Sequence, residues 1–202
     1  MTRVSRAVMF IALVAVLTSG CDTAERREKG GNGAAMNMQG AAEHADAMLD
    51  ATIDAVVPQL QWAHHVTTIG SCDVSRRRKI MTIISSERRG NLLGVVERYW
   101  KRKGYRITAV RASKERPAIF ATSPDGFGIS LVFGYAGQAN LEVATPCVMK
   151  SDVAEPASPP NGPAYPPGGI PTPNVRSAFW SVEEPVRGTG GKGEGGQRTS
   201  VS

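Results

Sequence analysis

The feature that most constrains the fold is an unbroken series of apolar residues at every second position in the second half of the chain. The apolar positions are Phe127, Ile129, Leu131, Phe133 and Tyr135. Because successive side chains of a β-strand point to opposite faces, this period of two predicts a strand with one buried and one open face. Strands of this kind are typical of antiparallel sheets. The rest of the chain must therefore supply neighbouring strands and a layer that covers the apolar face.

Four further segments are expected to form strands, because they are rich in β-branched residues or alternate in polarity. One of them, 117–122, is joined to the alternating series by the turn sequence Ser123-Pro124-Asp125-Gly126. The others are 78–84, 105–111 and 141–145. In the segment 105–111, a regular strand places Tyr105, Ile107 and Ala109 on one face.

Two segments with helical periodicity are interspersed with these strands. Residues 41–57 carry apolar side chains at helical spacing, and Pro58 ends that helix. The second helix begins at Ser85 or Ser86 and runs through Lys103. Its apolar stripe consists of Leu92, Leu93, Val96, Tyr99 and Trp100. Gly90 and Gly94 interrupt its helix-forming residues, and we assign them no functional role from the sequence.

The order of these elements predicts a small two-layer α+β domain. We expect a mostly antiparallel sheet with one or two helices packed on one face, and disordered flanks. An alternative for part of the fold is a parallel crossover from the strand at 78–84, through the second helix, to the strand at 105–111. Residues 59–71 show no clear pattern.

The N-terminus has the features of a lipoprotein signal peptide. Arg3 and Arg6 precede an uncharged apolar run at 7–17, which is shorter than the roughly 20 residues of a membrane-spanning helix. Small residues then precede a cysteine in Ser19-Gly20-Cys21. This stretch resembles the bacterial lipobox, although Thr18 stands where that motif favours Leu. We expect cleavage before Cys21 and a lipid on its sulfur; the alternatives are an uncleaved anchor or an ordinary secretory signal.

Composition divides the chain into four parts. A signal peptide at 1–20 is followed by a polar, Gly-rich tether at 21–40 and by the α+β module at 41–150. From residue 151 to residue 202, proline and glycine dominate, which predicts a disordered tail. If Cys21 carries the lipid, Cys72 and Cys147 remain and frame the sheet segments. In an exported protein we expect them to form a disulfide that joins the ends of the sheet; the alternative is two buried thiols.

Several pieces of the module resemble a group of small uncharacterised lipoproteins of high-GC Gram-positive, actinobacterial-type bacteria. The pieces are the lipobox Cys21, Ser75-Arg76-Arg77-Arg78, Tyr99 to Tyr105, Thr122 to Phe127 and Thr145-Pro146-Cys147. The resemblance implies a lipid-anchored protein on the extracytoplasmic face of the cell membrane and a small α+β domain. It implies no activity and no catalytic residue.

Positive charge concentrates in the first strand, the second helix and the residues after it. The chain has a formal net charge of +6. The helix residues expected to avoid the sheet, and so to face an anionic surface, are Arg88, Arg89, Lys101 and Arg102. For an exported protein, anionic lipid headgroups or an anionic wall polymer are nearer partners than nucleic acid. The alternative is a basic face that binds only water.

No sequence motif indicates a catalytic or metal site. His64 and His65 are adjacent but lack further ligands at a metal-like spacing, so neither a metal nor a cofactor is expected. The sequence therefore favours a binding or interaction module. An envelope hydrolase with a dispersed site is the alternative, and a cleft that gathers His64 or His65 with Asp73 and a serine would indicate it.

Lipidation of Cys21 is directly testable. The mature protein should partition with membranes, and Cys21→Ser should release it or leave an unprocessed precursor, because the sulfur that carries the lipid is gone. Membrane fractionation and intact mass measure both effects. Ser19→Ala, which keeps a small residue before the cysteine, should be processed normally. An unmodified thiol at Cys21 of the mature protein would contradict the assignment.

Overall fold

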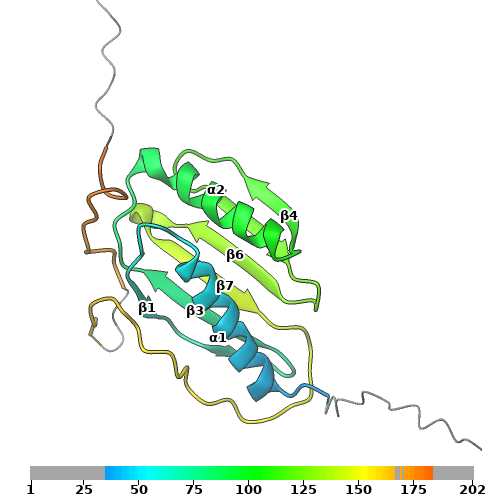
Figure 1. The fold of residues 1–202 in the computed structure, drawn as a ribbon. Helices are drawn as coiled ribbons and strands as arrows, with labels where there is room; N and C mark the ends of the chain where they lie inside the picture. Colours follow the sequence, from blue (N-terminus) through cyan, green and yellow to red (C-terminus); the bar gives the residue numbers. More distant parts are fainter. Residues whose placement is uncertain (1–34, 167–168, 170, 184–202) are drawn as a thin grey trace, which may run out of the picture. The chain divides into compact units, whose positions relative to one another are not determined.

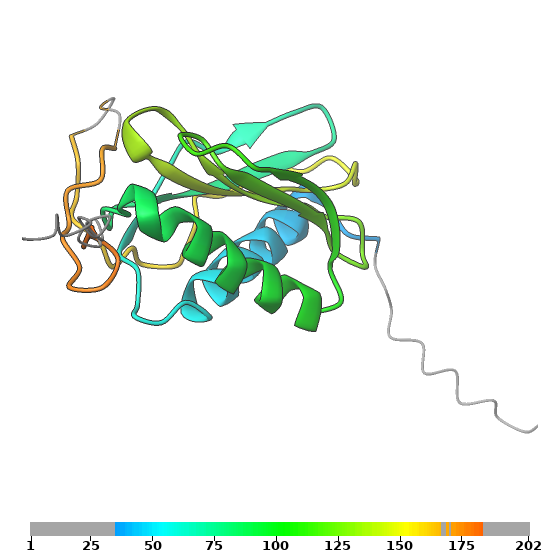
Figure 2. The same ribbon diagram turned by 90° about the horizontal axis from the view of Figure 1, so that it is seen from above.

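The structure, a computed structural model, describes residues 35–166, 169 and 171–183. These residues form a seven-stranded sheet with two helices on one face (Figure 1). Seen from above, both helices lie on the same side of the sheet and leave the other face open (Figure 2). The α+β two-layer prediction is therefore confirmed. The signal peptide, Cys21 and most of the tether lie outside the described residues, as do residues 184–202.

The strands follow the spatial order β1-β3-β7-β6-β5-β4, and β2 pairs with β3. Their bounds are Trp62–His64 for β1, Thr68–Ile69 for β2, Val74–Ile80 for β3, Arg106–Arg111 for β4, Ala118–Thr122 for β5, Gly128–Phe133 for β6 and Ala139–Ala144 for β7. Every pair is antiparallel. It follows that β3 and β4 point in the same direction, but β7, β6 and β5 lie between them. The chain does pass from β3 through a helix to β4, as in the predicted parallel crossover, but the two strands it connects are not neighbours in the sheet.

The two helices pack their apolar stripes on this sheet. Asn37 is the N-cap of helix α1 (Met38–Asp54), and its side chain accepts a hydrogen bond from the Gly40 amide at 2.9 Å. It therefore starts before the predicted residue 41 and ends before Val57. Helix α2 (Ser86–Arg102) buries Leu92, Val96 and Trp100 as predicted. The Trp100 indole donates to Thr52 Oγ1 at 3.2 Å, which joins the two helices inside the core.

Strand β3 lies four residues earlier than the sequence predicts. The prediction placed the strand at 78–84 because that segment is rich in β-branched residues. In the structure Arg76 and Arg78 point toward α1 and are buried, with 1% and 0% of their surface exposed. They take the positions that apolar side chains occupy in the neighbouring strands, because carboxylates on α1 neutralise them.

A second correction concerns the segment after residue 150, which the sequence predicts to be disordered. Residues 151–166 and 171–183 run along the domain as a strap, drawn in yellow and orange in Figure 1. The strap covers the outer edge of β1: the Gly162 amide donates to the Trp62 carbonyl at 2.8 Å, and Asn161 Oδ1 accepts from the Trp62 amide at 2.9 Å. Only glycine fits at 162, since a Cβ there would lie 2.6 Å from the Trp62 oxygen.

The strap is held by one large apolar side chain as well as by hydrogen bonds. Trp180 is 1% exposed and belongs to the main hydrophobic core. Its indole donates to the Pro58 carbonyl at 2.7 Å. Burial of this side chain contributes roughly 4–6 kcal/mol toward the entropic cost of ordering the strap, and the hydrogen bonds of the strap to the domain add to it. Composition alone does not reveal this, because the rest of the segment is rich in proline, glycine and serine.

Cys72 and Cys147 form a disulfide, as the sequence predicts, with their Cα atoms 4.8 Å apart. They lie just before β3 and just after β7, which are neighbours in the sheet. In the chain-entropy model, a cross-link across this length of chain stabilises the fold by about 4 kcal/mol. The bond therefore fastens the end of the sheet at which the described chain begins, where Asn37 pairs with Met149.

Trp180→Ala should lower the free energy of unfolding by about 3–5 kcal/mol, because it empties a filled core position. The substitution should also make the strap easier to cleave, so limited proteolysis measures the loss of stability in the strap itself. The neighbouring Phe179, 39% exposed, provides the control: Phe179→Ala should have a much smaller effect. Equal, small effects of the two substitutions would mean that the strap is not anchored through Trp180.

Candidate functional site

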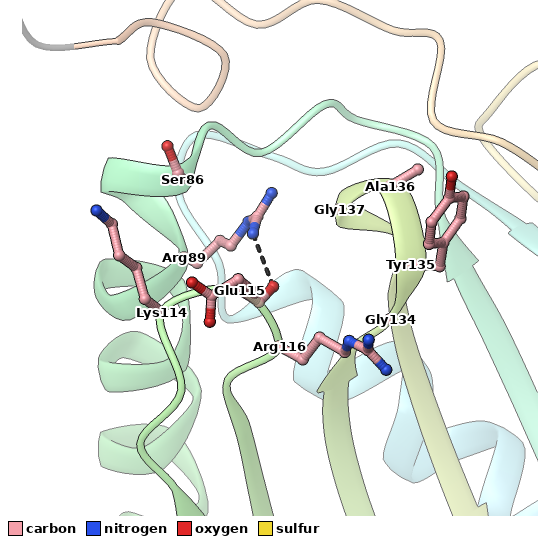
Figure 3. A pocket seen from close by; sticks show the side chains of 9 residues that line it. All are labelled: Ser86, Arg89, Lys114, Glu115, Arg116, Gly134, Tyr135, Ala136 and Gly137. Carbon is pink, nitrogen blue, oxygen red and sulfur yellow. Dashed lines mark hydrogen bonds between the residues drawn. The ribbon is translucent and has the colours of Figure 1, made fainter.

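A pocket of about 380 Å³ opens where α2 begins (Figure 3). Three segments surround it: the first turn of α2, the loop between β4 and β5, and the turn between β6 and β7. The lining residues are Ser86, Arg89, Lys114, Glu115, Arg116, Gly134, Tyr135, Ala136 and Gly137. We call this hollow the basic pocket, because three of these side chains are cationic and one is acidic.

Arg89 is the fixed cation of the basic pocket. Its Nη1 donates to the Glu115 carbonyl at 2.8 Å, the dashed bond in Figure 3. Its Nε is buried and has no hydrogen-bond partner among the described residues. Gly137 permits this position, since a Cβ there would lie 2.8 Å from Arg89 Nη2. The guanidinium is therefore held between α2 and two loops, with donor capacity that the protein itself does not use.

The turn between β6 and β7 has an uncommon backbone. Ala136 has φ +53°, in the left-handed region, and Gly137 follows with φ +72°. For a residue with a Cβ this conformation costs about 1 kcal/mol, so the surrounding structure must maintain it. The turn also holds Tyr135 in solvent, with 84% of its surface exposed. The unusual backbone beside an exposed aromatic ring and a fixed cation makes this turn a candidate for ligand binding.

The electrostatics of the basic pocket favour an anion. Lys114 and Arg116 are exposed on the loop beside Arg89, and the Glu115 side chain lies on the same loop near Ser113 Oγ, at 3.4 Å. At the start of α2 the pKa of Glu87 lies below its ordinary value, because its own backbone N–H and the Ser86 hydroxyl donate to the carboxylate. The lining therefore contains three cationic residues and one acidic residue, although Lys114 and Arg116 extend away from Arg89 on opposite sides (Figure 3).

The structure separates the four cations that the sequence places on one basic face. Arg88 and Arg89 are half-buried at the start of α2, where the Arg88 guanidinium stacks on the Phe179 ring at 4.6 Å. Lys101 and Arg102 are exposed at the other end of the helix, about 20 Å away, and Lys101 pairs with Glu97 at 2.6 Å. Only Arg89 lines the basic pocket.

Sequence analysis missed the residues that accompany Arg89. Lys114 and Arg116 lie on the loop before β5, and Tyr135 and Gly137 lie on the turn before β7. The only signal in the sequence is the cluster Lys114-Glu115-Arg116, a short charged loop between two predicted strands. Nothing in the sequence indicates that this loop meets the start of α2.

A second hollow, of about 520 Å³, continues from the basic pocket along the flank of α2. The two hollows share Ser86, Arg89 and Lys114. One wall is α2, with Gly90, Leu93 and Gly94, and the other includes Val110 at the end of β4. We call this hollow the α2–β4 groove. A further shallow hollow of about 340 Å³ lies on the open face of the sheet around Phe120 and Glu142.

A buried charge cluster lies away from these hollows, between α1 and β3. Asp46 contacts Arg76 Nε at 3.2 Å and Arg78 Nη2 at 3.0 Å, and Asp50 contacts Arg78 Nη2 at 3.2 Å. Asp46 Oδ1 and Arg76 Nε lack well-aligned hydrogen bonds, so these contacts act mainly as ion pairs. The cluster neutralises the arginines in the core and provides no open site for a ligand.

His64 belongs to this cluster and not to a catalytic cleft. Its Nδ1 accepts from Arg78 Nη1 at 2.9 Å, and its Nε2 donates to the Ser158 carbonyl in the strap at 2.7 Å. Asp73 lies elsewhere, immediately before the start of β3 and beside Gly70. The charged neighbours of His65 are Lys79, Arg77 and Glu142. Asp73 is thus not among the neighbours found for either histidine, and the described residues do not show the arrangement expected of a hydrolase.

The described residues contain no group of three His, Cys, Asp or Glu side chains arranged to hold a metal. Neither helix within residues 35–183 is long and apolar enough to cross a bilayer. Comparison of the chain with protein-family models, with curated proteins and with solved structures finds no match. The basic pocket and the α2–β4 groove therefore have to be interpreted from their own chemistry.

The contact between His64 and the strap should depend on pH. The pKa of His64 is lowered, chiefly by burial and also by Arg78, while Ser158, Asp46 and Asp50 oppose the shift. The unfolded chain therefore binds more protons than the folded one as the pH falls below about 6.5, the ordinary pKa of histidine. The stability contributed by His64 is present above that pH and is lost during acidification.

As the pH falls from 7.5 to 5.5, the protection factor of the Gly162 amide, which corrects the exchange rate for its intrinsic dependence on pH, should decrease as the strap loosens. His64→Gln should remove most of this pH dependence. His65→Gln is the matched control, because His65 also has a lowered pKa, from burial and from Lys79 and Arg77, but no hydrogen bond joins its ring to the described part of the strap. A pH dependence that persists in His64→Gln would contradict this assignment.

Proposed function

We propose that this chain is a lipid-anchored protein of the cell envelope whose α+β domain binds an anionic ligand in the basic pocket. Cys21 holds it to the extracytoplasmic face of the membrane, as the lipobox-like sequence and the resemblance to actinobacterial-type lipoproteins imply. The observation that carries the binding role is the meeting of Arg89, Lys114 and Arg116 around one pocket of about 380 Å³.

The chemistry of the basic pocket suits binding better than catalysis. Arg89 is positioned by the Glu115 carbonyl and by Gly137, and its side chain lines the pocket. Phosphate and carboxylate groups accept from guanidinium donors in a directional way, so a fixed arginine favours such a ligand. The lining offers no histidine and no cysteine to act as base or nucleophile. We therefore prefer the binding module to the hydrolase.

The position of the pocket favours an anionic wall polymer over the headgroups of the anchoring membrane. The described chain begins beside Met149, beyond the C-terminal end of β7, whereas the basic pocket lies at the N-terminal end of β7 (Figure 1). The tether thus enters the domain at the end of the sheet opposite the pocket. Tyr135 adds an exposed ring beside the cations, which suits a ligand that also has apolar surface.

Replacement of both loop cations, Lys114→Ala with Arg116→Ala, should weaken binding of poly(glycerol phosphate) roughly 30-fold, because each cation contributes on the order of 1 kcal/mol near an anionic surface. Binding should also weaken with added salt. The mature chain carrying Cys21→Ser is used, so that no lipid contributes. Titration calorimetry or fluorescence anisotropy measures the affinity.

The matched control is Lys101→Ala with Arg102→Ala, which removes the same charge from the other end of α2. It should leave polymer binding nearly unchanged. A parallel titration with vesicles of graded anionic lipid content tests the membrane as the ligand. Equal losses from both pairs would indicate attraction by net charge alone, and preferential binding to vesicles would replace the wall polymer with lipid headgroups.

A further inference from the structure

The two outer edges of the sheet differ in whether another segment of the described chain covers them. The outer edge of β1 is covered by the strap, through hydrogen bonds between Trp62 and residues 161 and 162. The other edge strand, β4, pairs only with β5, and no described segment pairs with its outer side. An uncovered edge presents a row of backbone donors and acceptors that can pair with another extended chain.

The α2–β4 groove lies beside this uncovered edge. Its lining is mixed: Leu93, Val110 and Pro117 are apolar, and charged residues surround them. The charged residues are the cations Arg89, Arg111 and Lys114 and the carboxylates Glu87 and Glu97, which leaves a positive excess. Val110 is 60% exposed although it lies on the helix side of its strand. A Cβ at Gly90 would meet no other atom within 4 Å, whereas one at Gly94 would lie 3.4 Å from Arg98 Nη1. The GxxxG spacing thus creates room next to the edge strand.

An irregularity in β4 directs Val110 into this groove. The sequence places Ala109 on the same face as Tyr105 and Ile107. In the structure the register with β5 shifts between Ile107 and Ala109. Ile107 pairs with Ala121 and Val110 pairs with Ile119. Because Ala121 and Ile119 both belong to the core on the helix side, Ile107 and Val110 lie on that side as well. A β-bulge re-aims side chains in this way, and bulges are common beside binding sites.

We propose that the α2–β4 groove binds an extended, acidic polypeptide segment, which adds as a further strand to the free edge of β4. This inference rests on the anion-binding role proposed for the basic pocket, whose cations at the end of the groove accept an acidic side chain of the segment in place of a polymer phosphate. Alternate side chains of the segment point into the groove between Leu93 and Val110 and against the flat surface of Gly90 and Gly94. The main chain pairs with β4.

A polypeptide fits this groove better than an acyl chain does. An acyl chain would cover the edge of β4 and remove water from its backbone groups without replacing the lost hydrogen bonds, which is costly. A strand replaces them at every second residue. The continuity of the groove with Arg89 and Lys114 then selects for a carboxylate at one end of the segment.

The test is selection of a displayed library of random octapeptides on the mature chain carrying Cys21→Ser. Selected peptides should alternate apolar residues and carry Asp or Glu toward one end. Gly90→Leu fills the groove and should reduce their affinity at least tenfold. This substitution replaces a helix glycine with a better helix former, so it should not unfold the domain. Asn91→Leu is the control: the same side chain is added one position along, on an exposed part of α2 outside the groove.

A second measurement separates strand addition from other modes of binding. Methylation of the peptide amides that face β4 should abolish binding, whereas methylation of the alternate amides should not, because only the first set donates to the edge strand. Failure to enrich peptides over the Gly90→Leu protein would overturn the inference. So would equal binding to both methylated forms, or binding of monomeric dodecyl phosphate that Gly90→Leu abolishes. Poly(glycerol phosphate) binding that survives in Gly90→Leu would show that the basic pocket functions even if the peptide inference fails.

Discussion

The structure depends on the neutralisation of two arginines inside the protein. Arg76 and Arg78 stand in the core-facing row of β3, and Asp46 and Asp50 of α1 supply the opposite charges. Loss of one partner from a buried ion pair costs roughly 3–5 kcal/mol, a large share of the 5–15 kcal/mol that stabilises a typical domain. This requirement fixes the position of α1 over β3. Through His64 and Ser158, it also fixes the strap against β1.

The two halves of the sheet differ in how their outer edges are covered. We call the half that contains β1 and β3 the closed half, because the strap covers its edge, and the half that contains β5 and β4 the open half. On the closed side α1, the disulfide and the strap hold β3 and its neighbours, and Trp180 completes the core. On the open side α2 covers the face of the sheet but leaves the outer edge of β4 unpaired. The basic pocket and the α2–β4 groove both lie on the open side. The contacts that fasten the strap and the two hollows beside α2 therefore lie on opposite halves of the sheet.

The sequence predicts those elements whose patterns are set by local physics. The alternation from Phe127 to Phe133 predicts β6, and the stripe through Leu92, Val96 and Trp100 predicts α2, because in both cases one face is apolar and the other is not. The predicted strand begins four residues after the true start of β3, because the pattern of the sequence does not reveal that Arg76 and Arg78 are buried. The ordered strap is missed because its order depends on one tryptophan and on distant partners. The Ala109 assignment fails because a bulge needs a partner strand to define it.

The sequence by itself determined the α+β class, the approximate positions of most elements and the pairing of Cys72 with Cys147. Those features follow from periodicity, turn chemistry and cysteine number, which are local or countable properties. Only the tertiary structure decided which cations share a site. Arg89 meets Lys114 and Arg116 because the β4–β5 loop and the β6–β7 turn converge on the start of α2. Lys101 and Arg102, although close to Arg89 in sequence, lie about 20 Å away, because a helix separates its ends by a fixed rise per residue.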